Sequence, residues 1–272
     1  MNKKYKFLCN VLLGVLGIIT VIPFVWMFLS SFKHNTEIVS LSQSFFPKEF
    51  TFDNNYGIQD NFDFIRLFMN SLFVALAVTG LVIYTSTISG FVLSKYQFKG
   101  RNLLFGLIMA TMMIPWAVTI IPRYSMILKF GWIDSYAALI IPSSVSAFGI
   151  FMLRQYISTI PDDIIEAARI DGANEFYIFH KIIFPMARNG ISSIAIFQFL
   201  WIWEDYLWPY LVINNEAKQL LSVGLKAFNG RYGTDYGGLF AATTISIIPV
   251  IIVYLIFQKR FIEGVAASAV KG

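Results

Sequence analysis

The chain of 272 residues is 57 % hydrophobic, 17 % aromatic and only 14 % charged. A soluble domain is roughly 45–50 % apolar and about 25 % charged, so this composition excludes an ordinary soluble protein and a disordered one. The single cysteine, Cys9, excludes an internal disulfide, and two histidines leave little for a metal-dependent enzyme. With a formal charge of +5, we interpret Lys and Arg as determinants of membrane topology and not as a nucleic-acid surface.

Six stretches are long and apolar enough to cross a bilayer, for which a helix needs roughly 20 residues. They cover about 7–32, 67–94, 102–122, 135–153, 190–213 and 236–258. The first stretch follows three lysines, as a secretory signal does, but it is too long for a signal core and no small-residue cleavage site follows it. The pattern predicts an all-α, polytopic membrane protein with six transmembrane helices in one transmembrane domain over residues 1–272.

The Lys and Arg residues are distributed unevenly between the two predicted sides. If the N-terminus is cytoplasmic, 13 of the 21 lie inside, and the short 95–101 loop is purely basic. Because cytoplasmic loops carry an excess of Lys and Arg, we expect both termini in the cytoplasm.

The predicted inner segment 154–189 is too long for a tight connection and too patterned for a disordered one. Pro161 suits the start of a helix, and Asp162 and Asp163 follow in the first turn, where the helix dipole favours negative charge. A predicted apolar stripe follows, made of Ile164, Ile165, Ala168 and Ile170.

The pair Asp171-Gly172 predicts a break after this first helix, with glycine in the left-handed conformation. A second helix is expected from about 174 to 183, ended by Pro185. Such short amphipathic helices need another surface on which to bury their apolar sides. Lipid-surface helices usually have a strongly cationic polar face, whereas this segment mixes acids and bases, which favours a protein groove over the lipid surface.

The triplets Glu-Ala-Ala at 166–168 and Asp-Gly-Ala at 171–173, followed by Ile182 and Pro185, resemble the EAA loop of permease subunits of ATP-binding-cassette (ABC) importers. The resemblance covers roughly residues 65–272. The Lys-Tyr-x-Phe-x-Gly-Arg loop at 95–101 and the Ala-Val-Lys-Gly ending are similar to the carbohydrate-uptake branch, the maltose-type inner-membrane permeases.

This resemblance implies the type I ABC-importer permease fold and a place in the cytoplasmic (inner) membrane of a bacterium or archaeon. It implies four kinds of partner: a second homologous permease, an ATP-binding-cassette ATPase dimer, an extracytoplasmic solute-binding protein and the lipid bilayer. No nucleic-acid partner, cofactor or metal is expected on this chain, and ATP and Mg belong to the partner ATPase. The chain itself lacks a phosphate-binding loop and any catalytic set, so we expect it not to be an enzyme.

In such permeases the EAA helix couples the ATPase to the spanning helices. Carried onto this chain, the resemblance implies that Glu166 and Gly172 carry the coupling. Ala167 and Ala168 would permit close approach, while Arg169 and Asp171 would fix the corner or pair with charges on the ATPase.

The fifth stretch contains two adjacent acids that should not face lipid. We consider a solute path formed by Trp203, Glu204, Asp205 and Trp208, in which carboxylates accept hydrogen bonds from sugar hydroxyls and tryptophans stack on sugar rings. The alternative is an aromatic belt at the outer membrane interface. The family usually has Trp-Asn-Glu at this point, so the extra acid leaves room for an amino or basic solute.

Two further alternatives remain open. One is a permease for a non-sugar solute such as an amino sugar, peptide or polyol phosphate. The other is a stand-alone secondary transporter, which would need a midplane ion site and usually internal repeats, and the sequence has no such repeat.

Overall fold

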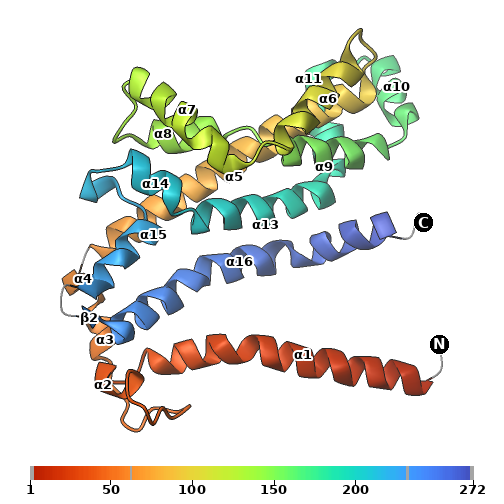
Figure 1. Ribbon diagram of the computed structural model, residues 1–272. Helices are drawn as coiled ribbons and strands as arrows, with labels where there is room; N and C mark the ends of the chain where they lie inside the picture. Colours follow the sequence, from red (N-terminus) through yellow and green to blue (C-terminus); the bar gives the residue numbers. More distant parts are fainter. Residues whose placement is uncertain (1–2, 62, 231–232, 270–272) are drawn as a thin grey trace. The chain divides into compact units, whose positions relative to one another are not determined.

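A computed structural model describes residues 3–61, 63–230 and 233–269, and these are mostly helical (Figure 1). The chain divides into two compact units. The first comprises Met1–Arg66 and Gly224–Ile248, and the second Leu67–Val223 and Pro249–Gly272. Residues 270–272 of the Ala-Val-Lys-Gly ending lie outside the described part of the chain.

The first unit is built around a long apolar helix. Its elements are α1 (Lys3–Ser30), α2 (Asn35–Ile38), α3 (Asp53–Tyr56), α4 (Ile58–Asn61), η4 (Leu225–Phe228), the antiparallel pair β1 (Asn229–Gly230) and β2 (Gly233–Thr234), and the first part of α16 (Tyr236–Ala269). The amide of Asn54 donates to the carbonyls of Ser31 (2.9 Å) and Lys33 (2.7 Å). Buried Lys33 in turn donates to the carbonyl of Ser44 (2.6 Å). These bonds hold the segment after α1 in place.

The second unit contains the later part of α16, from Pro249, and the remaining helices. They are α5 (Phe64–Lys95), α6 (Arg101–Met112), α7 (Trp116–Lys129), α8 (Tyr136–Ile140), η1 (Ile141–Ser143), α9 (Ala147–Ser158), α10 (Asp162–Ile170), α11 (Glu175–Tyr177), the π-helical turn η2 (Ile178–Ile183), α12 (Phe184–Met186), α13 (Arg188–Glu204), α14 (Leu207–Val212), η3 (Glu216–Lys218) and α15 (Leu221–Gly224). Its core includes fully buried Val78 and Val82 of α5, with Leu153 and Ile157 of α9.

The prediction of an all-helical polytopic membrane protein is confirmed. Among the residues that the structure describes, four helical stretches are long and apolar enough to cross a membrane, namely Lys4–Ser30, Phe64–Lys95, Tyr136–Ser158 and Tyr236–Ile262. The bent pair α6 and α7 makes a fifth if it is one span. The predicted stretch 190–213 corresponds to α13, with 17 residues, and α14. The count of six spans stays a prediction.

The stretch predicted at 102–122 is not one straight helix. α6 ends at Met112, α7 begins at Trp116, and the two are bent by 101°. Pro115 stands at the break, where it lacks an N–H and disfavours the helical conformation of the residue before it. Pro122 lies inside α7, which runs on to Lys129.

Two glycines allow α5 and α9 to approach closely. A Cβ atom at Gly90 would lie 2.8 Å from the backbone nitrogen of Arg154, and one at Gly149 would lie 2.4 Å from the Oγ of Ser86. In a membrane, where helices associate largely by close packing, small residues at such contacts let backbones come together.

We expect Gly90→Ala to destabilise the protein, because the new methyl group meets backbone that can only move with its helix. Overpacking of this kind costs about 1–3 kcal/mol. Thermal unfolding of the detergent-solubilised protein measures the effect. Gly106→Ala is the matched control, since nothing lies within 4 Å of its added Cβ. Equal melting temperatures for the two variants would contradict a close α5–α9 contact.

Candidate functional site

The segment between α9 and α13, residues 159–187, forms a sharp corner that we call the corner loop. α10 begins directly after Pro161 and ends at Ile170, as predicted. Gly172 has a φ of +83°. The N–H of Gly172 donates to the carbonyl of Arg169 (3.0 Å), and the N–H of Ala173 donates to that of Ala168 (2.9 Å). This pair of bonds is a Schellman motif, which needs the left-handed conformation that glycine adopts without strain.

The second half of the corner loop begins at Asn174, whose side chain accepts the N–H of Tyr177 (2.8 Å) and so caps α11. The expectation that Pro185 ends this helix is wrong, because α12 contains Pro185 and continues to Met186. The wider π turn η2 comes directly before it. Proline cannot close an α-helical bond to the carbonyl four residues earlier, and the change of register to a π turn accommodates it.

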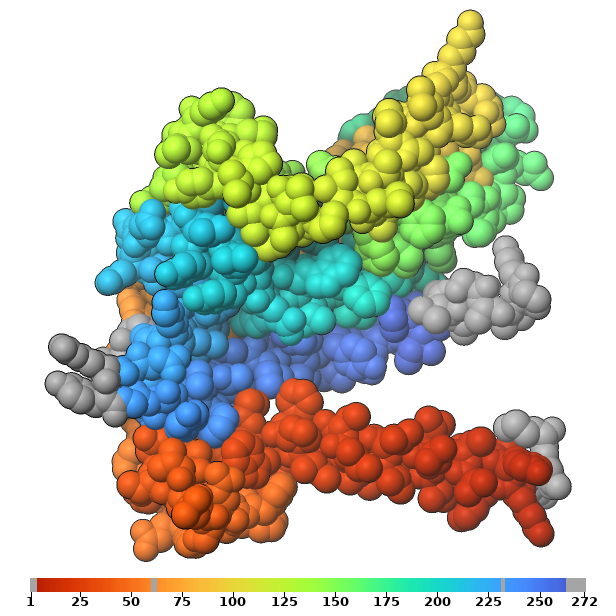
Figure 2. Space-filling view, in the orientation of Figure 1, coloured from red at the N-terminus to blue at the C-terminus, as the bar shows by residue number. Residues whose placement is uncertain are grey.

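The proposed coupling residues lie mostly on the outside of this corner. Glu166, Ala167, Arg169, Asp171 and Gly172 are exposed, and Ala168 is half-buried. Figure 2 shows the green segment that includes α10 at the surface. Beside it lies a groove of about 550 Å³ lined by Ala168, Asp171, Gly172, Ala173, Asn174, Tyr177 and Ile182.

The predicted apolar stripe of α10 is only partly correct. Ile165 is buried and Ile164 and Ala168 are half-buried, whereas Ile170 is 86 % exposed. Ile170 follows Ile165 by five residues, which at 3.6 residues a turn is about 140° around the helix. The exposed side of the corner therefore presents an apolar side chain as well as charges.

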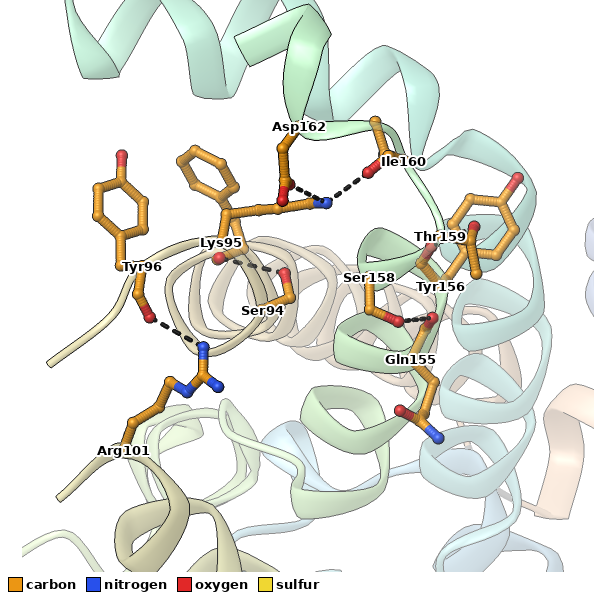
Figure 3. Close-up of polar contacts among 11 residues, drawn as sticks. Ser94, Lys95, Tyr96, Arg101, Gln155, Tyr156, Ser158, Thr159, Ile160 and Asp162 are labelled. Atoms are coloured by element: carbon orange, nitrogen blue, oxygen red, sulfur yellow. Dashed lines mark hydrogen bonds and ion pairs between the residues drawn. The ribbon is translucent and has the colours of Figure 1, made fainter. Parts of the chain in front are cut away.

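The corner loop is held by Lys95, the last residue of α5, and by Tyr96, which follows it. Sequence reasoning missed both as site residues. The Nζ of Lys95 donates to the Oδ1 of Asp162 (2.7 Å) and to the carbonyl of Ile160 (Figure 3). The hydroxyl of Tyr96 donates to the Oε2 of Glu175. The sequence shows Lys95 only as one of the basic residues of the 95–101 loop, since 67 positions separate it from Asp162.

Arg169 and Glu175, which lie on the two sides of the Gly172 turn, form an ion pair. The Nε of Arg169 lies 2.9 Å from the Oε1 of Glu175, and the Arg169 guanidinium lies 5.6 Å from the centre of the Tyr96 ring. Hydrogen bonds from Tyr96 and then from Arg169 lower the pKa of the Glu175 carboxyl below its ordinary value of 4.5. Burial, together with the hydrogen bond to Glu175, raises the pKa of Tyr96.

A second candidate site is a pocket of about 570 Å³ in the same unit. Its polar and aromatic lining comes from α7, residues 142–146, α13 and the break after α13, and includes Trp116, Arg123, Gln198, Trp201, Glu204 and Asp205. Neighbouring residues on one helix point about 100° apart, but α13 ends at Glu204, and Asp205 is extended (φ −63°, ψ 118°). This break lets both acids line one pocket.

The four residues proposed for the solute path separate into two groups. Glu204 and Asp205 line the pocket, whereas Trp203 and Trp208 are buried and are not among its lining residues. Trp203 packs against Phe68 and Phe199, with ring centres 5.5 and 5.7 Å away. The indole of Trp208 donates to the carbonyl of Ala138 (3.0 Å).

Sequence reasoning did not assign the pocket residues Trp116, Arg123, Gln198 and Trp201 to the solute path. Helical spacing places Trp116 and Arg123 on one face of α7, and Gln198 and Trp201 on one face of α13, but it does not show that these two faces meet. The guanidinium of Arg123 donates to the Oγ of Ser143 (2.9 Å) and lies 4.2 Å from the centre of the Trp208 ring. Its Nε is buried and has no hydrogen-bond partner among the residues that the structure describes. Over the same described ranges, no group of three His, Cys, Asp or Glu residues could hold a metal ion.

The contribution of Glu175 to stability should depend on pH. Because its folded-state pKa is lowered, the contribution is fully present above 4.5 and is lost as the pH falls through the folded value. We expect Glu175→Gln to lower the melting temperature at neutral pH, and the difference from the wild type to shrink at about pH 3. Glu166→Gln, at an exposed acid of the same loop, is the control. A difference that grows in acid would contradict the assigned ion pair.

The comparisons with known proteins agree in one family. Residues 82–266 match the family model described as "Binding-protein-dependent transport system inner membrane component". The arabinooligosaccharides transport system permease protein AraQ of Bacillus subtilis is 34 % identical over 271 residues, 98 % of this chain and 96 % of that protein. The sn-glycerol-3-phosphate transport system permease protein UgpE of Escherichia coli is 30 % identical over 93 % of this chain and 94 % of its own length.

A solved structure shares the fold. A chain of a bacterial ABC transporter involved in the import of the acidic polysaccharide alginate superimposes with a TM-score of 0.84 and 24 % identity, over 96 % of this chain and 99 % of that one. The predicted family, importer-permease fold and absence of an enzymatic role are therefore confirmed. This chain belongs to the family of inner-membrane components of binding-protein-dependent transport systems, as a permease subunit of an ABC importer.

Proposed function

We propose that this chain forms one half of the translocation path of an ATP-driven oligosaccharide importer and couples it to a separate ATPase through the corner loop. The observation that carries this proposal is the exposed corner itself. It consists of the short helix α10, which ends at the Gly172 turn, and of the groove beside this turn. Both termini and the corner loop would lie in the cytoplasm. The partner ATPase dimer would bind ATP and Mg, while a second permease and an extracytoplasmic solute-binding protein complete the importer.

In this proposal the exposed residues of α10 form the contact with the ATPase. Glu166 supplies charge, Ala167 and half-buried Ala168 allow close approach, and Asp171 lies beside the groove. Arg169 is already paired with Glu175, which favours a role in fixing the corner over one in reaching the ATPase.

We place the solute path along the pocket that contains Glu204 and Asp205. Their carboxylates would accept hydrogen bonds from sugar hydroxyls, and the exposed rings of Trp116 and Trp201 could stack on sugars. Trp203 and Trp208 would support the wall from behind, since both are buried. The oligosaccharide assignment is supported by the similarity to the arabinooligosaccharide permease over nearly the whole chain.

An anionic solute such as a polyol phosphate is the second candidate. Arg123 on the pocket wall favours it, because a guanidinium binds phosphate well, and the relative UgpE is named for glycerol phosphate. An uptake assay with the complete importer and its own binding protein distinguishes the two candidates. In this assay pentose oligosaccharides and glycerol 3-phosphate compete for uptake, and the preferred solute identifies the substrate class.

The corner is tested by Gly172→Val in the complete importer, purified through a tag on this chain. An ATPase and a second permease should co-purify with the wild-type chain. Valine at a φ of +83° is strained, so we expect the variant to reach the membrane but lose at least about 90 % of coupled uptake, a loss of the size typical for a disrupted coupling. Gly172→Asn is the matched control, because asparagine tolerates the left-handed conformation and should keep uptake. Normal uptake by the valine variant would contradict the coupling role.

The pocket is tested by Glu204→Gln and Asp205→Asn. A hydrogen bond to a charged group contributes about 1.5–3 kcal/mol, so we expect uptake at low solute concentration to fall about tenfold or more in each variant. ATP hydrolysis without solute should stay unchanged. Glu216→Gln, at an exposed acid in η3 outside this pocket, serves as the control. Unchanged uptake and solute preference in both pocket variants would remove these acids from the path.

A further inference from the structure

α5 is an unbroken helix of 32 residues whose side chains bind parts of the second unit that are distant in sequence. At its end, Lys95 and the following Tyr96 hold the corner loop. Farther back, Thr85 Oγ1 donates to the carbonyl of Ser144 (2.9 Å). Near its start, Asn70 donates to the carbonyls of Ala217 (3.0 Å) and Gln219 (2.9 Å). The same helix therefore contacts several separate segments.

Lys95 fixes the start of α10. Its side chain is only 5 % exposed, and a buried ammonium group is costly unless its hydrogen bonds are satisfied. The two acceptors that satisfy it, the carbonyl of Ile160 and the carboxylate of Asp162, lie on either side of Pro161. The position of α10 is thereby tied to the end of α5.

Tyr96 fixes the other side of the corner. Its hydroxyl binds Glu175, which follows the Gly172 turn, and its ring lies beneath Arg169, which precedes that turn. Arg169 and Glu175 are themselves paired at 2.9 Å. Lys95 and Tyr96 together therefore hold both α10 and the start of α11.

Along the chain, the corner loop is joined to α9 and α13 through irregular segments. Residues 159–161 separate α10 from α9, and the π turn η2 lies between α11 and α13. α-Helical structure runs without a break from Phe64 to Lys95. Lys95 is itself the last residue of this unbroken helix, so its contact with the corner loop reaches α5 without an intervening loop.

α5 also contacts the frame of the pocket. Ser144, which accepts from Thr85, lies between the pocket residues Ser143 and Val145. At the start of α5, Ser71 Oγ accepts the N–H of Leu221 (2.8 Å), and the next residue, Ser222, donates to the carbonyl of Asp205 (2.7 Å). A displacement of α5 along its axis would therefore reach two sides of the pocket.

We infer that α5 is the rod that carries movement of the corner loop to the pocket, and that Lys95 and Tyr96 are the positioning residues that fasten the loop to it. This inference rests on the proposed coupling function. Neither residue needs to touch the ATPase or the solute, because both act by holding α10 and α11.

The test is the double variant Lys95→Met with Tyr96→Phe in the complete importer in proteoliposomes, where ATP hydrolysis and solute uptake are measured together. We expect the ATPase to co-purify as in the wild type and hydrolysis to continue, while the ATP used per solute imported rises about tenfold, within the range typical of a lost coupling. Lys99→Met is the matched control, because this exposed lysine of the same loop should leave the ratio unchanged. Lys95→Arg should also preserve it, since a guanidinium can donate to both oxygens.

A purely structural role would lower hydrolysis and uptake together and leave their ratio constant, and that result would overturn the inference. If the double variant does not fold, Asp162→Ala with Glu175→Ala removes the carboxylates to which Lys95 and Tyr96 donate, and the same rise in ratio is expected. An unchanged ratio with the ATPase still bound overturns the role of α5 but not the proposed function. Failure of the wild type to bind any ATPase overturns the proposed function itself.

Discussion

Hydrogen bonds from Lys95 and Tyr96 attach the corner loop to the end of α5. α10 has nine residues, and isolated helices shorter than about 12–15 residues are marginal in water. Its buried face is small, because Ile165 is its one fully buried apolar side chain. The contacts at the two ends of the corner add to this small buried face, and the outer side of α10, which includes Glu166 and Ala167, stays exposed.

A second constraint is the bilayer, in which every backbone polar group needs a partner. The chain leaves helical geometry at Asp205, at the wall of a pocket. Local bonds meet the need there, since Ser222 donates to the carbonyl of Asp205 and the side chain of Asp205 accepts the N–H of Trp208. The same break lets two adjacent acids line a polar pocket, which avoids the cost of exposing them to lipid.

The contacts around α5 join these two regions within one unit. Gly90 and Gly149 bring α5 and α9 close together, and side-chain hydrogen bonds from α5 reach the segments next to the pocket. Packed elements of this kind move as rigid bodies, because close-packed interiors transmit displacement with little compression. In the proposed coupling, a displacement of α5 would carry movement of the corner loop to the pocket.

Features that depend on neighbouring residues could be predicted from the sequence alone. Apolar length indicated the long helices, Pro161 with two aspartates marked the start of α10, and Gly172 marked its end. Features that depend on distant residues could not be predicted. The bond from Tyr96 to Glu175 joins residues 79 apart, and no periodicity shows that Trp203 and Trp208 face the core while Trp116 and Arg123 face a pocket. The sequence determines local conformation through backbone sterics and hydrophobic period, whereas only the tertiary structure decides which distant side chains meet, because that depends on how whole helices pack.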